Sequence, residues 1–304
     1  PDRMIRGLEA IMDATGAKEG IIATKAKYKD GIAALEKNLT GGRIRIHLLD
    51  DFYPAGDEQV IVQEVTGRVV PQGGIPLKVG CVVVNVETLL NVADALDDTP
   101  VTRKYLTING EVAAPCTLRL PVGTPVAAAL ALAGVKSTEG LRVIDGGPMM
   151  GKLIEDLEQP VTKTTKGLLV LPAEHPIILK RIQSCDRIIR QAKTACIQCR
   201  YCTDLCPRFL LGHKMEPHRI MRAIRNTEAA ADVIKMAFTC TECGVCEQYA
   251  CPMGLSPRKM NAMLKQELSK QGVKPDPPPT EQVVASIREH RKIPVKRLVS
   301  RLGL

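Results

Sequence analysis

Apolar residues in the first hundred positions recur first with helical and then with strand spacing. Residues 2–14 carry apolar side chains three and four positions apart, and Gly16 follows as a helix stop. Residues 20–25 are a short apolar run typical of a buried strand, 28–39 show a second helical pattern, and 43–50 alternate as a strand does. This order of strand, helix and strand predicts an α/β layer with a largely parallel sheet.

The next stretch predicts two further helix starts. Residues 51–67 place a Pro–Ala–Gly turn before a helix that begins near Asp57. Residues 68–80 are a loop rich in glycine and proline. Residues 81–96 predict a buried strand that runs directly into a helix, with Asn85 as the N-cap.

The segments that predict strands and helices become shorter between residues 101 and 171. The pair Asn109–Gly110 between two alternating segments predicts a hairpin with a tight turn. A short alanine-rich helix follows, and the runs 141–145 and 167–172 predict two more strands. Short strands with one helix indicate a small α+β module.

The last third of the chain is predominantly helical in pattern. Residues 175–195 predict one amphipathic helix, 208–239 contain helical repeats, and 257–268 predict another helix. The proline-rich stretch 274–282 predicts a stiff linker. A basic tail follows, for which we expect a solvated, partly helical segment, with docking on an acidic surface as the alternative.

Composition narrows the class of protein. A chain of 304 residues with 45% hydrophobic residues predicts about two to three globular domains. Aromatic residues make up only 3% of the chain, which argues against nucleic-acid binding by base stacking. The net charge of +9 counts the cysteines as neutral, so cysteine thiolates that held a negatively charged cofactor would offset part of it. We therefore expect no nucleic-acid partner.

Location follows from what the chain lacks. It has no run of about 18 apolar residues and no signal peptide, so we expect no membrane insertion. Exposed thiols suit the reducing cytoplasm. Because the chain starts at Pro1 in a helical pattern, we also expect upstream sequence to be missing.

Eight cysteines form two matching runs. Each run has the spacing C-x2-C-x2-C, followed a few residues later by a Cys–Pro pair, as bacterial ferredoxins use for four-iron clusters. Three close thiolates reach three corners of one cube, and the fourth cysteine of the run ligates the other cluster. We therefore predict one [4Fe-4S] cluster on Cys196, Cys199, Cys202 and Cys251, and a second on Cys240, Cys243, Cys246 and Cys206.

Two structural alternatives fit the runs less well. Zinc sites pair two C-x2-4-C knuckles and need four ligands, whereas each run here offers a triplet plus a Cys–Pro. A disulfide framework suits a shorter secreted chain. The remaining cysteines, Cys81, Cys116 and Cys185, are expected to be buried small hydrophobes. His213 and His218 are expected to be structural or on a helix surface, since cysteines fill every ligand position.

Four motifs together resemble one family. YPAGDEQ (53–59), VVNVETLLNV (83–92), GGPMMG (146–151) and the two cysteine runs are similar to the flavin-containing family of the Rnf complex C subunit. Within it the chain resembles most the cobalamin reductases of propanediol-utilisation microcompartments, over essentially its whole length.

The resemblance implies a multidomain α/β and α+β architecture. Residues 1–100 would be an FMN- and NADH-binding α/β domain whose N-terminal part is missing. Residues 101–173 would be a β-grasp module of the soluble-ligand-binding type, and 174–270 an α-helical ferredoxin domain with two [4Fe-4S] clusters. Residues 271–304 would be the linker and basic tail.

The resemblance also implies a flavin site. The family's FMN contacts fall on a segment that begins after the second predicted strand and on the start of a later helix. The family's glycine-rich phosphate loop would lie upstream of Pro1, which leaves binding of FMN or NADH by these residues alone open. For Asp57 and Glu58 the alternative is a favourable place at a helix start, and for Asn85 and Thr88 it is simple capping. The implied contacts are Tyr53, Gly56, Asp57, Glu58, Asn85 and Thr88.

The implied activity is electron transfer by cofactors. NADH would reduce FMN, and the clusters would relay electrons to cobalamin, making the protein an oxidoreductase with no catalytic side chain of its own. Cobalamin or a cobalamin-handling adenosyltransferase would be the partner, with shell proteins of a bacterial microcompartment as further candidates. The alternative is a non-enzymatic relay subunit at the periphery of an Rnf-type membrane complex.

Overall fold

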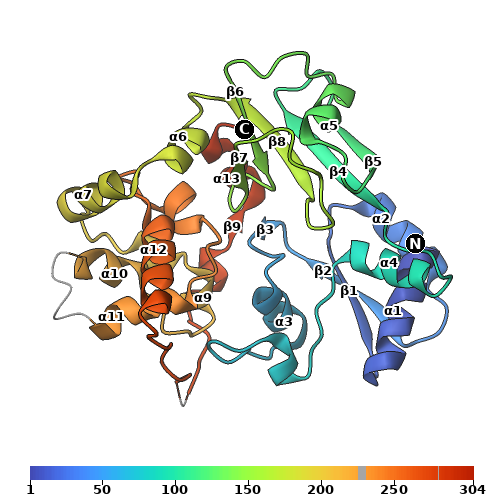
Figure 1. Cartoon of the computed structure of the whole chain (residues 1–304). Helices are drawn as coiled ribbons and strands as arrows, with labels where there is room; N and C mark the ends of the chain where they lie inside the picture. The colour runs from blue at the N-terminus through green and yellow to red at the C-terminus, as the bar shows by residue number, and fades with distance from the viewer. Residues whose placement is uncertain (225–230, 280) are drawn as a thin grey trace. The chain divides into compact units, whose positions relative to one another are not determined.

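The chain divides into two compact units. The computed structural model describes residues 1–224, 231–279 and 281–304. The first unit comprises Pro1–Val101 with Lys292–Val295, and the second comprises Thr102–Arg291 with Lys296–Leu304. Figure 1 shows the chain coloured from the N-terminus to the C-terminus.

Helix–helix packing and one parallel strand pair organise the first unit. Strand β1 (Gly20–Lys25) pairs in parallel with β2 (Ile44–Leu49), which confirms the predicted strand–helix–strand order. Helices α1 and α4 pack closely at Gly7, where an added Cβ would lie 2.0 Å from the carbonyl oxygen of Leu89. The helices of this unit are α1 (Asp2–Thr15), α2 (Lys29–Asn38), α3 (Glu58–Thr66), η1 (Pro76–Val79) and α4 (Val86–Ala95).

The buried strand that we expected at residues 81–85 does not form. This segment has no regular secondary structure, and the side chain of Val82 is 55% exposed. An apolar run becomes a buried strand only beside a partner strand, and the β1–β2 sheet of the structure has two strands. The helix start is as predicted, because the side chain of Asn85 accepts a hydrogen bond from the amide of Glu87 at 3.1 Å.

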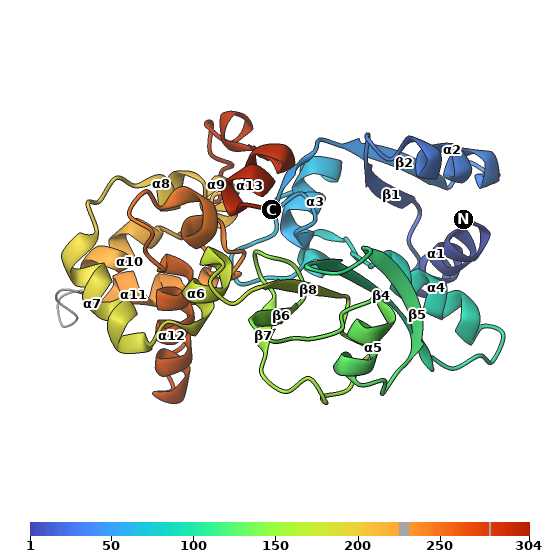
Figure 2. The ribbon, with the colours of Figure 1, turned by 90° about the horizontal axis from the view of Figure 1, so that it is seen from above.

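A five-stranded mixed sheet forms the first part of the second unit. Its strand order is β5-β4-β8-β6-β7, with β4 and β8 parallel. Buried and exposed residues alternate along β4, and Leu106 and Ile108 join the core beneath α5. Figure 2 shows α5 lying against one face of this sheet. The elements are β4 (Arg103–Gly110), β5 (Cys116–Pro121), α5 (Val126–Leu132), β6 (Leu141–Asp145), β7 (Lys152–Ile154) and β8 (Gly167–Pro172).

The hairpin of β4 and β5 is confirmed, but its predicted turn is wrong. Strand β4 continues through Asn109 and Gly110, and the turn follows at residues 111–115. Gly110 pairs with Val170 of β8, so closely that a Cβ would lie 2.0 Å from the carbonyl oxygen of Val170. Pairing with a distant strand therefore overrides the local turn preference.

Helices form most of the remaining second unit. The expected single helix over 175–195 is wrong, because the chain breaks at Gln183 and Ser184 starts a new helix by accepting from the amide of Arg187. Residues 225–230, which belong to the expected helical spacer, lie outside the described residues. The helices are α6 (Pro176–Ile182), α7 (Cys185–Ala195), α8 (Tyr201–Asp204), α9 (Pro207–Leu210), α10 (Pro217–Ala223), α11 (Ala231–Lys235), η3 (Met236–Thr239), η4 (Val245–Ala250) and α12 (Pro257–Lys270).

The C-terminal tail is more ordered than the solvated segment we expected. Strand β9 (Ile293–Pro294) pairs with β3 (Phe52–Tyr53), following the short η5 (Glu289–Arg291). Helix α13 (Val295–Leu302) buries Leu298 and Leu302, so its amphipathic pattern serves packing. In the described part of the chain, no helix is long and apolar enough to cross a membrane.

Candidate metal centre

The two C-x2-C-x2-C loops have the same unusual backbone although their sequences differ. Gln198 and the corresponding Glu242 have φ values of 57° and 56°, and Arg200 and the corresponding Gly244 have values of 71° and 82°. Left-handed residues within a short loop turn successive amide groups towards one side. In the second loop the amide of Glu242 donates to the sulfur of Cys240 at 3.4 Å. Each loop is thus shaped to surround an electron-rich group.

The first loop and a distant cysteine line one cavity. We name these four residues, Cys196, Cys199, Cys202 and Cys251, the outer cysteine set. Burial, followed by the neighbouring thiols of the set, raises the pKa of Cys202 to about 12. The amide of Gln198 bridges the sulfur of Cys196 (3.1 Å) and the backbone carbonyl of His218 (3.2 Å).

The second loop lies with Cys206 in a less accessible place. We name Cys206, Cys240, Cys243 and Cys246 the inner cysteine set. Cys206 and Cys246 are buried, and Cys206 and Cys240 pack in one apolar core. Burial raises the pKa of Cys206 to about 12. Burial also raises the pKa of Cys246 well above the usual thiol value, and the other three thiols of the set add to the shift.

The donors fit iron–sulfur clusters better than single ions. Among the described residues, no three His, Cys, Asp or Glu are arranged to hold one metal ion. A four-iron cube spreads its thiolates further apart than a single ion does. Four thiols with N–H donors directed at sulfur form a donor set suited to such a cube.

One face of helix α12 contacts the second loop, and our sequence analysis missed it. Asn261 is 1% exposed and donates from its amide to the sulfur of Cys240 at 3.6 Å. Lys265 donates to the carbonyl oxygen of Cys240 at 3.0 Å. Arg258, Asn261 and Lys265 follow at helical spacing, so one polar face on a helix directly after the second cysteine run was the available signal.

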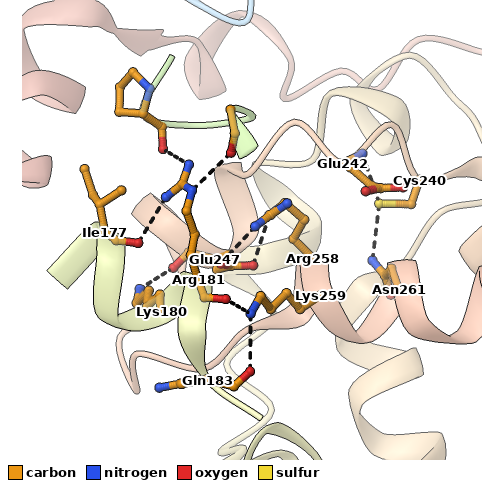
Figure 3. Close-up of polar contacts among 12 residues, drawn as sticks. Ile177, Lys180, Arg181, Gln183, Cys240, Glu242, Glu247, Arg258, Lys259 and Asn261 are labelled. Atoms are coloured by element: carbon orange, nitrogen blue, oxygen red, sulfur yellow. Dashed lines mark hydrogen bonds and ion pairs between the residues drawn. The ribbon is translucent and has the colours of Figure 1, made fainter. Parts of the chain in front are cut away.

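A buried ion pair joins Glu247, the residue after Cys246, to Arg258 of helix α12. The side chain of Glu247 has no exposed surface, and Arg258 donates to it at 3.1 Å. Lys180 donates to the carbonyl oxygen of Glu247 at 2.7 Å. Figure 3 shows Glu247 between these two cations, with Asn261 directed at Cys240 nearby. Arg258 thus matches the charge of Glu247, and Lys180 adds positive charge near Cys246.

The turn at residues 146–151 of the sheet module packs against the second loop. A Cβ at Gly244 would lie 2.6 Å from the carbonyl oxygen of Met149. Arg181 holds the turn by donating to the carbonyl oxygens of Pro148 (2.7 Å) and Gly151 (3.1 Å). Burial lowers the pKa of Arg181 to about 10, which leaves its guanidinium charged at neutral pH.

The residues expected to bind flavin lie at two helix starts of the first unit. Tyr53 ends β3, and Asp57 caps α3 by accepting from the amides of Gln59 (3.1 Å) and Val60 (3.2 Å). Asn85 caps α4. These contacts are local, so they satisfy the structural explanation and leave the flavin role a prediction. A Cβ at Gly56 would meet no atom within 4 Å, so open space lies beside it. Glu58 and Thr88 are exposed in the first turns of α3 and α4.

The remaining cysteines and histidines are less uniform than expected. Cys185 is exposed at the start of α7, so the prediction of a buried small hydrophobe is wrong there. Cys81 and Cys116 are half-buried, and Cys116 packs against the core of the sheet. The ring Nδ1 of His218 lies 2.7 Å from the hydroxyl of Thr203, a structural contact.

Three domain families match successive parts of the chain. Residues 1–94 match the Nuo51 FMN-binding domain, 105–153 the SLBB domain, and 195–256 the 4Fe-4S dicluster domain. An NAD+-reducing [NiFe]-hydrogenase chain shares the fold, with a TM-score of 0.52 and 20% identity over 91% of this chain and 52% of that chain. The fold and the sites thus define a modular electron-transfer protein.

Curated relatives narrow the family. The cobalamin reductase PduS of Salmonella typhimurium is 48% identical over 99% of this chain and 67% of its own length. The C subunit of the Na(+)-translocating ferredoxin:NAD(+) oxidoreductase complex of Acetobacterium woodii is 32% identical over 68% of this chain and 44% of its own length. The chain belongs to the PduS cobalamin reductase family, a family of oxidoreductases.

Proposed function

We propose that the chain carries electrons from NADH through FMN and two [4Fe-4S] clusters to cobalamin. The observation that carries this proposal is the 48% identity over 99% of the chain to a cobalamin reductase, in a protein whose loops gather two sets of four thiols. When bound, FMN accepts two electrons together and clusters pass them on singly. The two-electron oxidation of NADH would thereby be coupled to the transfer of single electrons to cobalamin.

The side chains of this protein hold and orient the cofactors in this proposal. The outer and inner cysteine sets each supply four thiolates, with the fourth thiol drawn from the other run. Helix α8, which carries Cys202, packs against η4, which carries Cys246, so the two sets are neighbours. The flavin would contact Tyr53, Gly56, Asp57, Glu58, Asn85 and Thr88, and the five-stranded sheet with α5 would be a β-grasp module.

A relay protein within a larger complex is the second candidate. The likeness to the C subunit of an ion-translocating complex favours it, because that protein is named as part of a larger assembly. In this case the electrons would pass to a protein partner, and cobalamin would stay oxidised. The higher identity and longer match to the reductase make the enzyme our preferred proposal.

The cellular setting follows from the reductase proposal. Reduced cobalamin would be used by an adenosyltransferase, and the protein would act in the cytoplasm within a diol-utilisation microcompartment bounded by shell proteins. Co-purification of the protein with intact microcompartments, and its loss from them after shell disruption, would test this setting.

An anaerobic reduction assay tests the proposed function. Full-length protein with FMN and iron–sulfur clusters would receive NADH and then aquocobalamin, whose visible spectrum reports the cobalt. We expect cobalt reduction that is lost when Cys202 or Cys246 is replaced by serine. If NADH bleaches flavin and clusters while cobalamin stays oxidised, the relay function replaces the reductase function.

A further inference from the structure

A cavity in the second unit has the second cysteine loop as one wall. Its volume is about 390 Å³, within the usual range of ligand sites. Thr241 and Glu242, which lie between Cys240 and Cys243, form this wall. A further part of the lining comes from the sheet module, from Met150 through Leu153. A molecule in this cavity would therefore contact the loop that carries three of the four inner cysteines.

The lining combines cations with apolar surface. Lys152, Arg181 and Arg258 contribute positive charge, and Glu242 contributes the one carboxylate of the lining. Arg258 is matched by Glu247, and Glu242 lies 3.8 Å from the ammonium group of Lys265.

Lys152 and Arg181 then remain as the cations available to a ligand. Lys152 is exposed, and Asp145, its partner on the β6–β7 ladder, offsets only part of its charge at the open end of the side chain. Arg181 donates to the backbone carbonyls of Pro148, Gly151 and Ile177, which carry no net charge. Met150, 54% exposed, and Leu153 supply the apolar part. This chemistry suits a singly charged anion on a partly apolar molecule.

We propose that this cavity binds the phosphodiester of the cobalamin nucleotide loop and so holds the corrinoid beside the inner cysteine set. The proposal rests on the proposed cobalamin reductase function. The cavity is too small for a whole corrinoid but has room for a phosphate ester with its sugar. Other phosphate esters, such as the pyrophosphate of NADH, share this chemistry and are distinguished by the test.

The test uses Lys152, because Arg181 also holds the turn and its replacement would disturb the fold. Lys152→Glu reverses the charge and Lys152→Met keeps the apolar stem. Lys136→Glu makes the same charge change at an exposed residue of the same module outside the cavity lining. The protein would be full-length with its cofactors. The ligands are aquocobalamin and diaquocobinamide, which keeps the corrin and cobalt but lacks the nucleotide loop and its phosphodiester.

Two measurements are made on each variant. Equilibrium dialysis of the oxidised protein gives the Kd for each corrinoid, and the NADH-dependent reaction gives KM. For Lys152→Glu we expect the Kd and KM of cobalamin to rise about tenfold and those of cobinamide to change less than about twofold. Lys152→Met should raise the cobalamin values about threefold, and Lys136→Glu should leave them unchanged.

Three results would overturn the site. These are equal changes for both corrinoids, a change in the KM of NADH in place of cobalamin, and no change in any constant. If the wild type reduces neither corrinoid, the reductase function fails, and the Kd values alone decide the site. If both corrinoids are reduced but Lys152→Glu does not discriminate between them, only the site fails.

Discussion

The outer and inner cysteine sets share their spacing and their loop backbone but lie in different surroundings. In the outer loop Arg200 occupies a left-handed position with its side chain exposed. In the inner loop the corresponding residue is the buried Gly244, against which the carbonyl of Met149 packs. Spacing therefore determines the shape of the loop, whereas packing against other elements determines its accessibility and its electrostatic environment.

The largest expected effect is the loss of one whole cluster when the fourth cysteine of a set is replaced. Replacing Cys251 with serine should disturb only the cluster on the outer set, and replacing Cys206 with serine only that on the inner set, because the fourth thiol of each set comes from the other run. Each variant should lose up to about half of the iron. Iron and sulfide analysis with EPR spectra checks this. Loss of the outer signal in the Cys206 variant would show that the pairing is uncrossed.

Substitution at the corresponding loop positions should give a strongly unequal result. Gly244→Ala combines a left-handed φ of 82° with a Cβ placed 2.6 Å from the carbonyl oxygen of Met149. We expect it to lower the free energy of unfolding by roughly 2 kcal/mol or more. Arg200→Gly should change it by less than about 1 kcal/mol, since glycine tolerates φ of 71°. Chemical denaturation of the cofactor-loaded protein checks both, and equal losses would contradict the comparison.

Alkaline pH should destabilise the iron-free protein through the inner thiols. The pKa of Cys206 is raised to about 12 in the fold, above its unfolded value, so the unfolded state loses its proton first. With an ordinary thiol pKa of 9.0 in the unfolded state, stability is therefore full below about pH 8 and falls as pH rises towards 12, by about 1.4 kcal/mol at pH 10 for this thiol. Urea melts from pH 7.5 to 10 measure it. The Cys206→Ala variant should show a shallower decline, and an equal slope would assign the effect elsewhere.

The smallest expected effect is a shift in reduction potential when a side chain that donates a hydrogen bond to a cysteine sulfur is replaced. Asn261→Leu removes a buried N–H donor to Cys240, and a lost donor disfavours the more negative, reduced form of a cluster. The reduction potential of the inner site should fall by about 40 mV, the equivalent of about 1 kcal/mol for one electron. EPR-monitored redox titration resolves the two sites. Gln198→Leu is the matched change at the outer set, and a shift of the outer potential in the Asn261 variant would contradict this assignment.

Local rules sufficed for some elements and failed for others. The helix starts at Asp57 and Asn85 and the strands β1 and β2 follow from capping residues and alternation, which act within a few residues. The strand expected at 81–85 and the turn at Asn109–Gly110 failed because distant strands decide them: β8 pairs with Gly110, and no strand pairs with 81–85 in the described sheet. The helix break at Gln183 and the helix cap at Ser184 lie within a continuous amphipathic pattern, so the sequence pattern did not reveal them.

The candidate site shows the same division. Spacing alone named the eight thiols, whose role as ligands stays a prediction. The surroundings of the inner loop come from elements far away in sequence, such as Met149 and Arg181, which no local pattern connects to Cys240. Asn261 and Arg258 were accessible in principle, because they share one face of a helix near the second run. The buried ion pair of Glu247 with Arg258 could be identified only from the folded structure.

Strand β9 has a consequence for how the protein is made. Ile293 pairs with Tyr53, and Lys292 lies 3.2 Å from Glu64 and 3.5 Å from Asp50, so a segment about 200 residues further along the chain completes the first unit. A ribosome adding about 5–20 residues per second takes on the order of 10–40 s to synthesise the second unit in between. During this interval the edge of β3 lacks its neighbour and presents unpaired backbone groups to other strands.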